Sequence, residues 1–212
     1  MPSSTGATVN RAVRILIAED VDLVGEAFEA LLATEAGFDV VARVNRGDEV
    51  VKAALRHEPD IALLDIDMPG ATGIEACAEL TKALPSCKVL LLTALPGSGY
   101  LPRALDAGAS GYLVKSASAK QLIDGILAVV KGGVAIDPTL AADALRTGPS
   151  PLTARECDIL RLVDKNLPTR QIAEELFLTN GTVRNYLSSA MAKLDAVSRN
   201  EAVKKAKSRG FL

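Results

Sequence analysis

The feature that most constrains the fold is an alternation of short apolar runs with stretches of helical periodicity. The five apolar runs cover residues 13–18, 38–44, 60–64, 88–92 and 110–114. The helical stretches cover residues 22–34, 46–57, 72–83, 99–107 and 118–131. Strands that alternate with helices are typical of βαβ units, and near-continuous apolar strands indicate burial on both faces. The sequence therefore predicts an α/β domain whose five-stranded parallel sheet is covered by helices.

Polar side chains follow four of the predicted strands. The first strand is followed by Glu19 and Asp20, the third by Asp65, the fourth by Thr93 and the fifth by Lys115. Because ligands of an open parallel sheet bind outside the carboxyl ends of its strands, we expect these side chains to share one crevice. Taken singly, the acid pair could cap the next helix and Asp65 could be a turn residue. The combination favours a functional site.

The residue types in this crevice indicate phosphoryl chemistry. Clustered carboxylates repel one another, which raises their pKa values, and a hard divalent cation such as Mg²⁺ relieves the repulsion. A cation held there can bridge a carboxylate nucleophile and an incoming phosphoryl group. The Lys115 ammonium could neutralise the phosphoryl oxygens, and the Thr93 hydroxyl could donate a hydrogen bond to one of them.

The segments IAED, LLDIDMPGATG, LLLTA and GYLVKSAS resemble the signature segments of response-regulator receiver domains, which have a flavodoxin-like fold. The resemblance covers residues 13–131. It implies that Asp65 is the phosphoacceptor and that a sensor histidine kinase supplies the phosphoryl group. It also implies that Mg²⁺ is bound by Glu19, Asp20, Asp65 and the backbone carbonyl of Asp67.

The same resemblance assigns roles to four residues at the ends of the fourth and fifth strands. Thr93 and Tyr112 match the pair that changes rotamer on phosphorylation, the tyrosine turning inward as the threonine moves toward the phosphoryl group. Lys115 matches the lysine that contacts the phosphoryl group. Ala94 matches a position where a bulky side chain would hinder that group.

A different aspartate chemistry is an alternative. Asp65-Ile66-Asp67 after an apolar strand is also similar to the D-x-D opening of haloacid-dehalogenase-type phosphatases, in which the second aspartate is the general acid. That family carries its D-x-D on the first strand and its metal-binding acids late in the chain, whereas here the acid pair comes first. A second alternative keeps DNA binding but makes it ligand-driven or constitutive, independent of phosphorylation.

Breaks in the pattern divide the chain into further segments. Residues 1–12 are polar and read as a disordered leader, followed by the receiver domain at 13–132. Residues 133–150 read as a linker, in which Pro138 can start a short helix that Gly148 and Pro149 end. We expect an all-α domain at 151–212.

This last segment predicts four helices and no strand. Thr153 and Glu156 form a capping box that starts a helix at about 153–164, and QIAEEL is a short second helix. A three-residue turn separates QIAEEL from a longer helix at 181–194, and residues 199–209 form the fourth. A short helix, a tight turn and a longer helix are the plan of a helix-turn-helix.

The charge distribution and the third helix favour DNA as the partner of this segment. Residues 151–212 contain eleven Lys or Arg and seven Asp or Glu, a net charge of +4, whereas residues 1–150 carry −6. One stripe of the third helix is apolar, and the other side carries no acid. Arginine reads guanine and asparagine reads adenine, while hydroxyls and lysines fix phosphates. The apolar stripe is Val183, Leu187, Ala190 and Leu194; the expected DNA contacts are Thr182, Arg184, Asn185, Ser188 and Lys193.

The segments LTARECDILRLV, RQIAEEL, GTVRNYLSSAMAKL and SRNEAVKKA resemble the LuxR/NarL/FixJ-type output domain over its full length. By this resemblance the last helix is the dimer helix. The expected function is that of a two-component transcription regulator and not an enzyme. Phosphorylation would drive formation of a homodimer that binds double-stranded operator DNA, and RNA polymerase is a further candidate partner.

The remaining sequence features add two expectations about the environment of the protein. There is no run of about 18 apolar residues, so we expect no membrane span. Cys77, Cys87 and Cys157 have neither metal-ligand spacing nor a disulfide pattern, which indicates reduced thiols in the cytoplasm.

Overall fold

The computed structural model describes residues 11–94, 100–147 and 150–212. These divide into two compact units, one made of residues 11–94 and 104–137 and the other of residues 100–103 and 138–212. Residues 1–10 of the predicted leader lie outside the described part of the chain, as do Gly148 and Pro149. Within the described residues no helix combines the length and apolar character that crossing a membrane requires.

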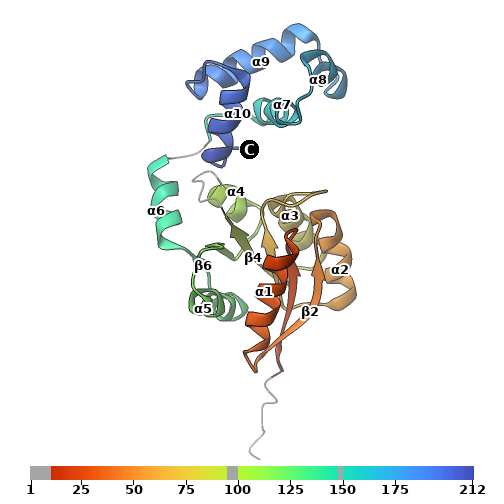
Figure 1. Ribbon diagram of the computed structural model, residues 1–212, viewed down its shortest axis with the longest axis vertical. Helices are drawn as coiled ribbons and strands as arrows, with labels where there is room; N and C mark the ends of the chain where they lie inside the picture. The colour runs from red at the N-terminus through yellow and green to blue at the C-terminus, as the bar shows by residue number, and fades with distance from the viewer. Residues whose placement is uncertain (1–10, 95–99, 148–149) are drawn as a thin grey trace, which may run out of the picture. The chain divides into compact units, whose positions relative to one another are not determined.

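The first unit is built on a parallel sheet, as predicted (Figure 1). Within the described residues the strand order is β2-β1-β3-β4-β5-β6, and every neighbouring pair is parallel. The strands are β1 (Val13–Ala18), β2 (Phe38–Val44), β3 (Ile61–Asp65), β4 (Lys88–Thr93), β5 (Gly111–Val114) and β6 (Ala135–Ile136). Five of them were expected. The two-residue strand β6 was not, because so short a run at the sheet edge carries no periodic signal.

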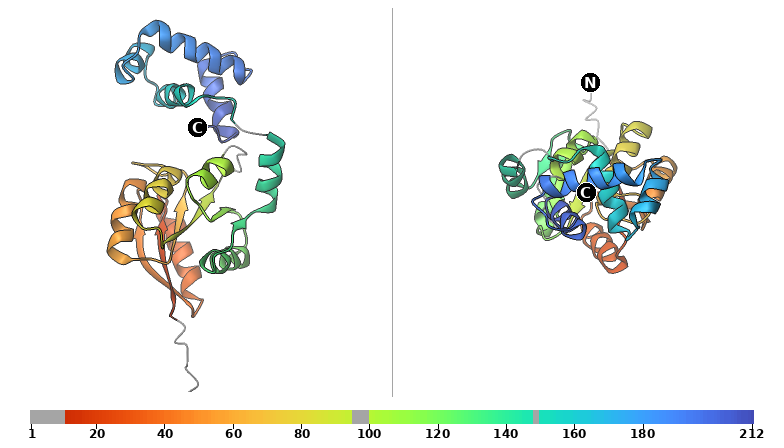
Figure 2. Two further views of the ribbon diagram at one scale, coloured as in Figure 1. Left: turned by 180° about the vertical axis from the view of Figure 1, so that it is seen from behind. Right: turned by 90° about the horizontal axis from the view of Figure 1, so that it is seen from above.

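Helices connect these strands along the chain. They are α1 (Asp22–Ala33), α2 (Val50–His57), α3 (Gly73–Ala83), α4 (Tyr100–Asp106) and α5 (Ala119–Val130). Side chains of α1 and α5 pack with alternate strand residues in one apolar cluster, so these two helices cover one face. Figures 1 and 2 show α2 and α3 on the opposite face. Fully buried strands such as β3 fit a sheet covered on both sides.

The second unit is helical, with the helix-turn-helix order that the sequence predicts. After α6 (Pro138–Thr147) come α7 (Ala154–Asp164), α8 (Thr169–Glu175), α9 (Asn180–Lys193) and α10 (Arg199–Ser208). The predicted capping box of Thr153 and Glu156 is confirmed at the start of α7. Helix α9 begins one residue earlier than expected, because the Thr179 hydroxyl accepts a hydrogen bond from the Thr182 amide and caps the helix there.

The core of the helical unit confirms the apolar stripe predicted on α9. Val183, Ala190 and Leu194 are fully buried, and Leu187 is nearly so. They pack with buried side chains of α7, α8 and α10 in a single apolar cluster. This packing determines which side of α9 faces inward and which side is left for other contacts.

Candidate functional site

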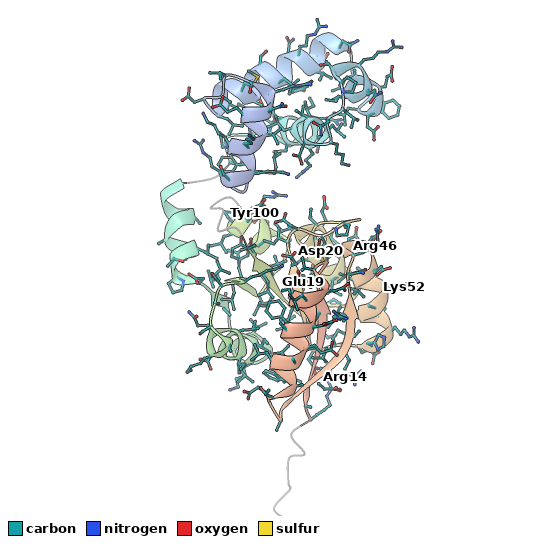
Figure 3. All side chains as sticks on the ribbon, viewed as in Figure 1. Arg14, Glu19, Asp20, Arg46, Lys52 and Tyr100 are labelled. Atoms are coloured by element: carbon teal, nitrogen blue, oxygen red, sulfur yellow. The ribbon has the colours of Figure 1, made fainter. Side chains whose placement is uncertain are left out.

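Three carboxylates meet at the carboxyl ends of β1 and β3. Glu19 and Asp20 follow β1 directly, and Asp65 is the last residue of β3. Figure 3 shows Glu19 and Asp20 where the first strand leads into α1. One oxygen from each of the three groups lies within 4.8 Å of the others. Glu19 and Asp65 are buried, whereas Asp20 is exposed to solvent. The expected convergence of these strand ends is therefore present.

The ammonium of Lys115 lies between the two buried carboxylates. Its Nζ is 2.6 Å from Glu19 Oε2 and 3.1 Å from Asp65 Oδ1. The backbone supports this position, because the Lys115 amide donates a 2.7 Å hydrogen bond to the Thr93 carbonyl at the end of β4. Burial alone would lower the pKa of Lys115, but its bonds to Glu19 and Asp65 outweigh burial and raise it.

The environment of Asp65 disfavours its charge. Burial and, to a lesser extent, the negative charges of Glu19 and Asp67 raise the pKa of Asp65 to about 6, against the attraction of Lys115. A bound cation would favour the ionised form. Glu19 Oε2 is buried and accepts no hydrogen bond from any described residue, even though Lys115 forms an ion pair with it. This all-oxygen donor set fits Mg²⁺.

The other predicted site residues of the α/β unit lie on neighbouring strand ends. Thr93 is 1 % exposed at the end of β4, and Ala94, which follows it, is exposed. Tyr112 on β5 is fully buried, opposite Leu91 of β4, so its ring points into the interior. Asp67 is exposed and is not one of the three clustered acids.

Two glycines that the sequence analysis did not single out hold the loop after Asp65 in place. The Gly73 amide donates to the Ile66 carbonyl, and a Cβ at Gly73 would lie 2.0 Å from the Asp65 carbonyl oxygen. A Cβ at Gly47 would lie 1.9 Å from the carbonyl oxygen of Ala71 in the same loop. Both positions require close backbone approach. Only the folded loop discloses this requirement, because the contacts join residues 8 positions apart at Gly73 and Asp65 and 24 positions apart at Gly47 and Ala71.

A second candidate site is the exposed side of α9. Arg184, Asn185 and Ser188 are exposed there, on the side away from the apolar core. Thr182 is half-buried, and its hydroxyl lies 2.9 Å from the Thr179 hydroxyl at the start of the helix. These four predicted DNA contacts therefore lie in the first ten residues of α9, where an exposed helix end could enter a major groove.

Lys193, the fifth predicted DNA contact, has a partner inside its own unit. Its ammonium donates a 2.7 Å hydrogen bond to Glu156 Oε2, and its side chain is 33 % exposed. It was expected to be available to a phosphate. That role stays a prediction, and the structure gives the same ammonium a second candidate role through Glu156.

Comparison with known proteins identifies the family of each part of the chain. Residues 15–127 match the family described as response regulator receiver domain, and residues 150–206 match that described as bacterial regulatory proteins, luxR family. The chain is 38 % identical over 199 residues to the transcriptional regulatory protein DesR of Bacillus subtilis (strain 168), which covers 94 % of this chain and 98 % of DesR.

Two solved structures are similar to this chain over nearly its whole length. The response regulator ChrA of a heme-sensing two-component system is 28 % identical with a TM-score of 0.56, and the match covers 95 % of this chain and 99 % of that one. The RcsB–DNA complex is 20 % identical with a TM-score of 0.64, covering 93 % and 99 %. The second likeness concerns the fold alone.

Proposed function

Because the chain belongs to the LuxR-type two-component response regulators, with a receiver domain and a DNA-binding helix-turn-helix domain, we propose that phosphorylation of Asp65 by a sensor histidine kinase controls its binding to operator DNA. The observation that carries the proposal is the buried Asp65 carboxylate, which shares its site with two further acids and Lys115. Proposed domain bounds are 13–132 for the receiver, 133–150 for the linker and 151–212 for the DNA-binding domain.

The proposed reaction transfers one phosphoryl group to Asp65. An Asp65 carboxylate oxygen attacks the phosphorus of the kinase phosphohistidine; a P–O bond forms and the P–N bond breaks, leaving the histidine to take up a proton. Glu19, Asp20, Asp65 and the Asp67 carbonyl would hold Mg²⁺, which when bound neutralises charge on the phosphoryl oxygens. Lys115 Nζ, already 3.1 Å from Asp65 Oδ1, would pair with those oxygens.

The new charge would then act on the strand ends beside it. An acyl phosphate adds roughly one to two negative charges and several acceptor oxygens. The Thr93 hydroxyl would donate to one of these oxygens, and the space next to Ala94 would admit the phosphoryl group. The buried Tyr112 ring would pack behind Thr93, so that local charge biases a packing equilibrium of the receiver surface.

Intact-mass measurement tests the phosphorylation step. Incubation with a small acyl phosphate and Mg²⁺ should add one phosphoryl group to the wild-type chain and none to Asp65→Asn. Asp67→Asn is the matched control, because Asp67 contributes its backbone carbonyl and should still allow the modification. A chain that never gains a phosphoryl group but binds its operator would support the ligand-driven or constitutive alternative. Multiple turnover of a small phosphoester would support the phosphatase alternative.

At the DNA, the exposed side of α9 would enter the major groove. Arg184 and Asn185 carry the donors and acceptors that read base edges, and the hydroxyls of Thr182 and Ser188 would contact phosphates. Two chains would present two such helices to half-sites about 34 Å apart, one turn of the duplex. The dimer helix would be α10, and a DNA-bound dimer would be in a position to contact RNA polymerase.

A further inference from the structure

One buried carboxylate joins the start of α7 to two residues on α9. Glu156 is 2 % exposed, and its Oε2 accepts hydrogen bonds of 2.7 Å from both the Thr153 amide and Lys193 Nζ. Its Oε1 accepts a 2.6 Å hydrogen bond from the Ser189 hydroxyl. Burial opposes the charge, but these donors outweigh it and lower the pKa of Glu156 to about 2. The acid is therefore ionised and paired at neutral pH.

The two partners on α9 are four residues apart and so lie one above the other on one flank of the helix. This flank separates the buried stripe from the exposed side that carries Arg184 and Asn185. A groove of about 480 Å³ lies along this flank. The lining of this groove comprises Thr153, Glu156, Thr182, Asn185, Tyr186, Ser189 and Lys193.

Apolar contacts are non-directional, so the buried stripe permits small rotations of α9 about its axis. Hydrogen bonds are directional, and charge-assisted bonds are the strongest of them. Ser189 and Lys193 donate two such bonds to the Glu156 carboxylate, and these bonds oppose rotation of α9. Glu156 also forms the capping box with Thr153 at the start of α7. Its bonds to Ser189 and Lys193 therefore tie the rotation of α9 to the position of α7.

We propose that Glu156 is a positioning residue for DNA recognition: it sets the rotation of α9, and Lys193 acts through this carboxylate and not through a phosphate. The inference rests on the proposed DNA-binding function and adds a specificity determinant to it. A rotated α9 would displace Arg184 and Asn185 from base edges while leaving the general positive charge intact. Loss of the restraint therefore lowers affinity for a specific sequence far more than affinity for arbitrary DNA.

The experiment uses the full-length chain treated with a small acyl phosphate and Mg²⁺. The probes are a duplex selected from a random library by the wild-type protein and a scrambled duplex of equal length. Glu156→Gln keeps the side-chain shape but removes the charge that holds Lys193. It should weaken binding to the selected duplex about tenfold and change binding to the scrambled duplex less than about twofold, since arbitrary DNA is bound mainly through charge.

The matched control is Asp158→Asn on α7, which lies outside the proposed dimer helix. Asp158 pairs with Arg161 of the same helix at 3.3 Å, and no described bond joins it to α9. This control should lower Tm by a similar or smaller amount and leave the ratio of specific to non-specific affinity unchanged. All affinities are compared at a temperature at which circular dichroism finds each variant folded.

Lys193→Met provides the second variant, at a side chain that is 33 % exposed. It should reproduce the loss caused by Glu156→Gln, and the double variant should be no worse than either single one, because both remove the same restraint. The dependence of affinity on salt should keep its wild-type slope. A lysine bound to a phosphate would instead reduce that slope by about 0.9.

Three outcomes would overturn the inference. In the first, Glu156→Gln keeps the wild-type affinity ratio. In the second, Lys193→Met weakens binding to both duplexes equally and reduces the salt slope, which makes Lys193 a phosphate contact. In the third, the wild-type protein selects no sequence at all, and the proposed DNA-binding function fails together with the inference.

Discussion

At the scale of single residues, the folded protein stabilises the negative charge of the Asp65 carboxylate poorly. It is buried beside Glu19, and burial raises its pKa to about 6 despite the neighbouring ammonium of Lys115. A raised carboxyl pKa means that the folded state prefers the protonated acid, so stability is lost as the pH rises through about 6. Such a loss of stability on ionisation is typical of a side chain that is retained for function.

Replacing Asp65 by Asn should therefore stabilise the receiver domain. The amide removes one of three crowded charges, and a shift of this size corresponds to about 1–3 kcal/mol. We expect a Tm several degrees higher than that of the wild type at pH 8 without divalent cations, measured by scanning calorimetry, and a smaller difference once Mg²⁺ is added. Asp67→Asn, at an exposed position, is the control. An unchanged or lower Tm for Asp65→Asn would refute this reading.

Gly73 gives a second residue-scale prediction. A Cβ there would lie 2.0 Å from the Asp65 carbonyl oxygen, so Gly73→Ala must displace the backbone of the phosphoacceptor. The expected cost is about 1–3 kcal/mol, as for overpacking, with phosphorylation by a small acyl phosphate slowed at least several-fold. Gly37→Ala is the matched control, because a Cβ at Gly37 meets nothing within 4 Å. Equal phosphorylation rates in the two variants would exclude the steric argument.

At the scale of elements, the sequence predicts what local patterns encode. The strand expected at 60–64 is β3 (Ile61–Asp65), and the capping box that starts α7 is present, because strand periodicity and capping depend on near neighbours. Strand β6 was missed because pairing with β5, not its own sequence, makes it a strand. The carboxylate cluster was predictable because parallel strands end at one edge of a sheet.

The contacts that escaped prediction form only when the chain packs in three dimensions. Glu156 was recognised only as a capping residue, because its bonds to Ser189 and Lys193 span 33 and 37 positions and leave no periodic trace. The requirement for glycine at Gly73 likewise depends on a loop folding back onto Asp65. Such contacts are properties of packing, which an isolated sequence pattern does not contain.

The helical domain should lose stability in acid through Glu156. Its pKa is lowered to about 2, so the stability that its charge provides is present above its ordinary pKa of 4.5 and is lost as the pH falls toward 2. We expect the NMR resonances of α7 and α9 to show that these helices unfold at a lower temperature at pH 3 than at pH 5. In Glu156→Gln this difference should shrink. The same pH dependence in both proteins would show that another group is responsible.

At the scale of the whole molecule, the part proposed to be phosphorylated and the part proposed to bind DNA carry opposite net charges. Residues 1–150 carry −6 and contain the site proposed for phosphorylation, whereas residues 151–212 carry +4 and contain the proposed DNA interface. The basic domain is suited to a polyanion, and the acidic domain to a cation and a phosphoryl group. Phosphorylation of the acidic domain must therefore alter DNA binding by the basic domain. Dimerisation of the chain is the proposed route.

Sedimentation velocity should detect that change. The untreated chain should sediment mainly as a monomer, and treatment with a small acyl phosphate and Mg²⁺ should shift it to a dimer because the receiver surface is repacked around the new charge. Asp65→Asn should remain in its untreated state under both conditions. A wild-type chain that sediments identically before and after stoichiometric phosphorylation would rule out dimerisation as the route.

The most direct test of control by Asp65 is operator affinity measured before and after phosphorylation. The probe is the duplex selected by the treated wild-type protein, and fluorescence anisotropy at fixed salt gives the Kd. We predict that phosphorylation tightens wild-type binding by about tenfold or more, a coupling of about 1.4 kcal/mol, and leaves Asp65→Asn unchanged. Equal tightening of Asp65→Asn, or no tightening of a fully phosphorylated wild-type protein, would contradict the proposed switch.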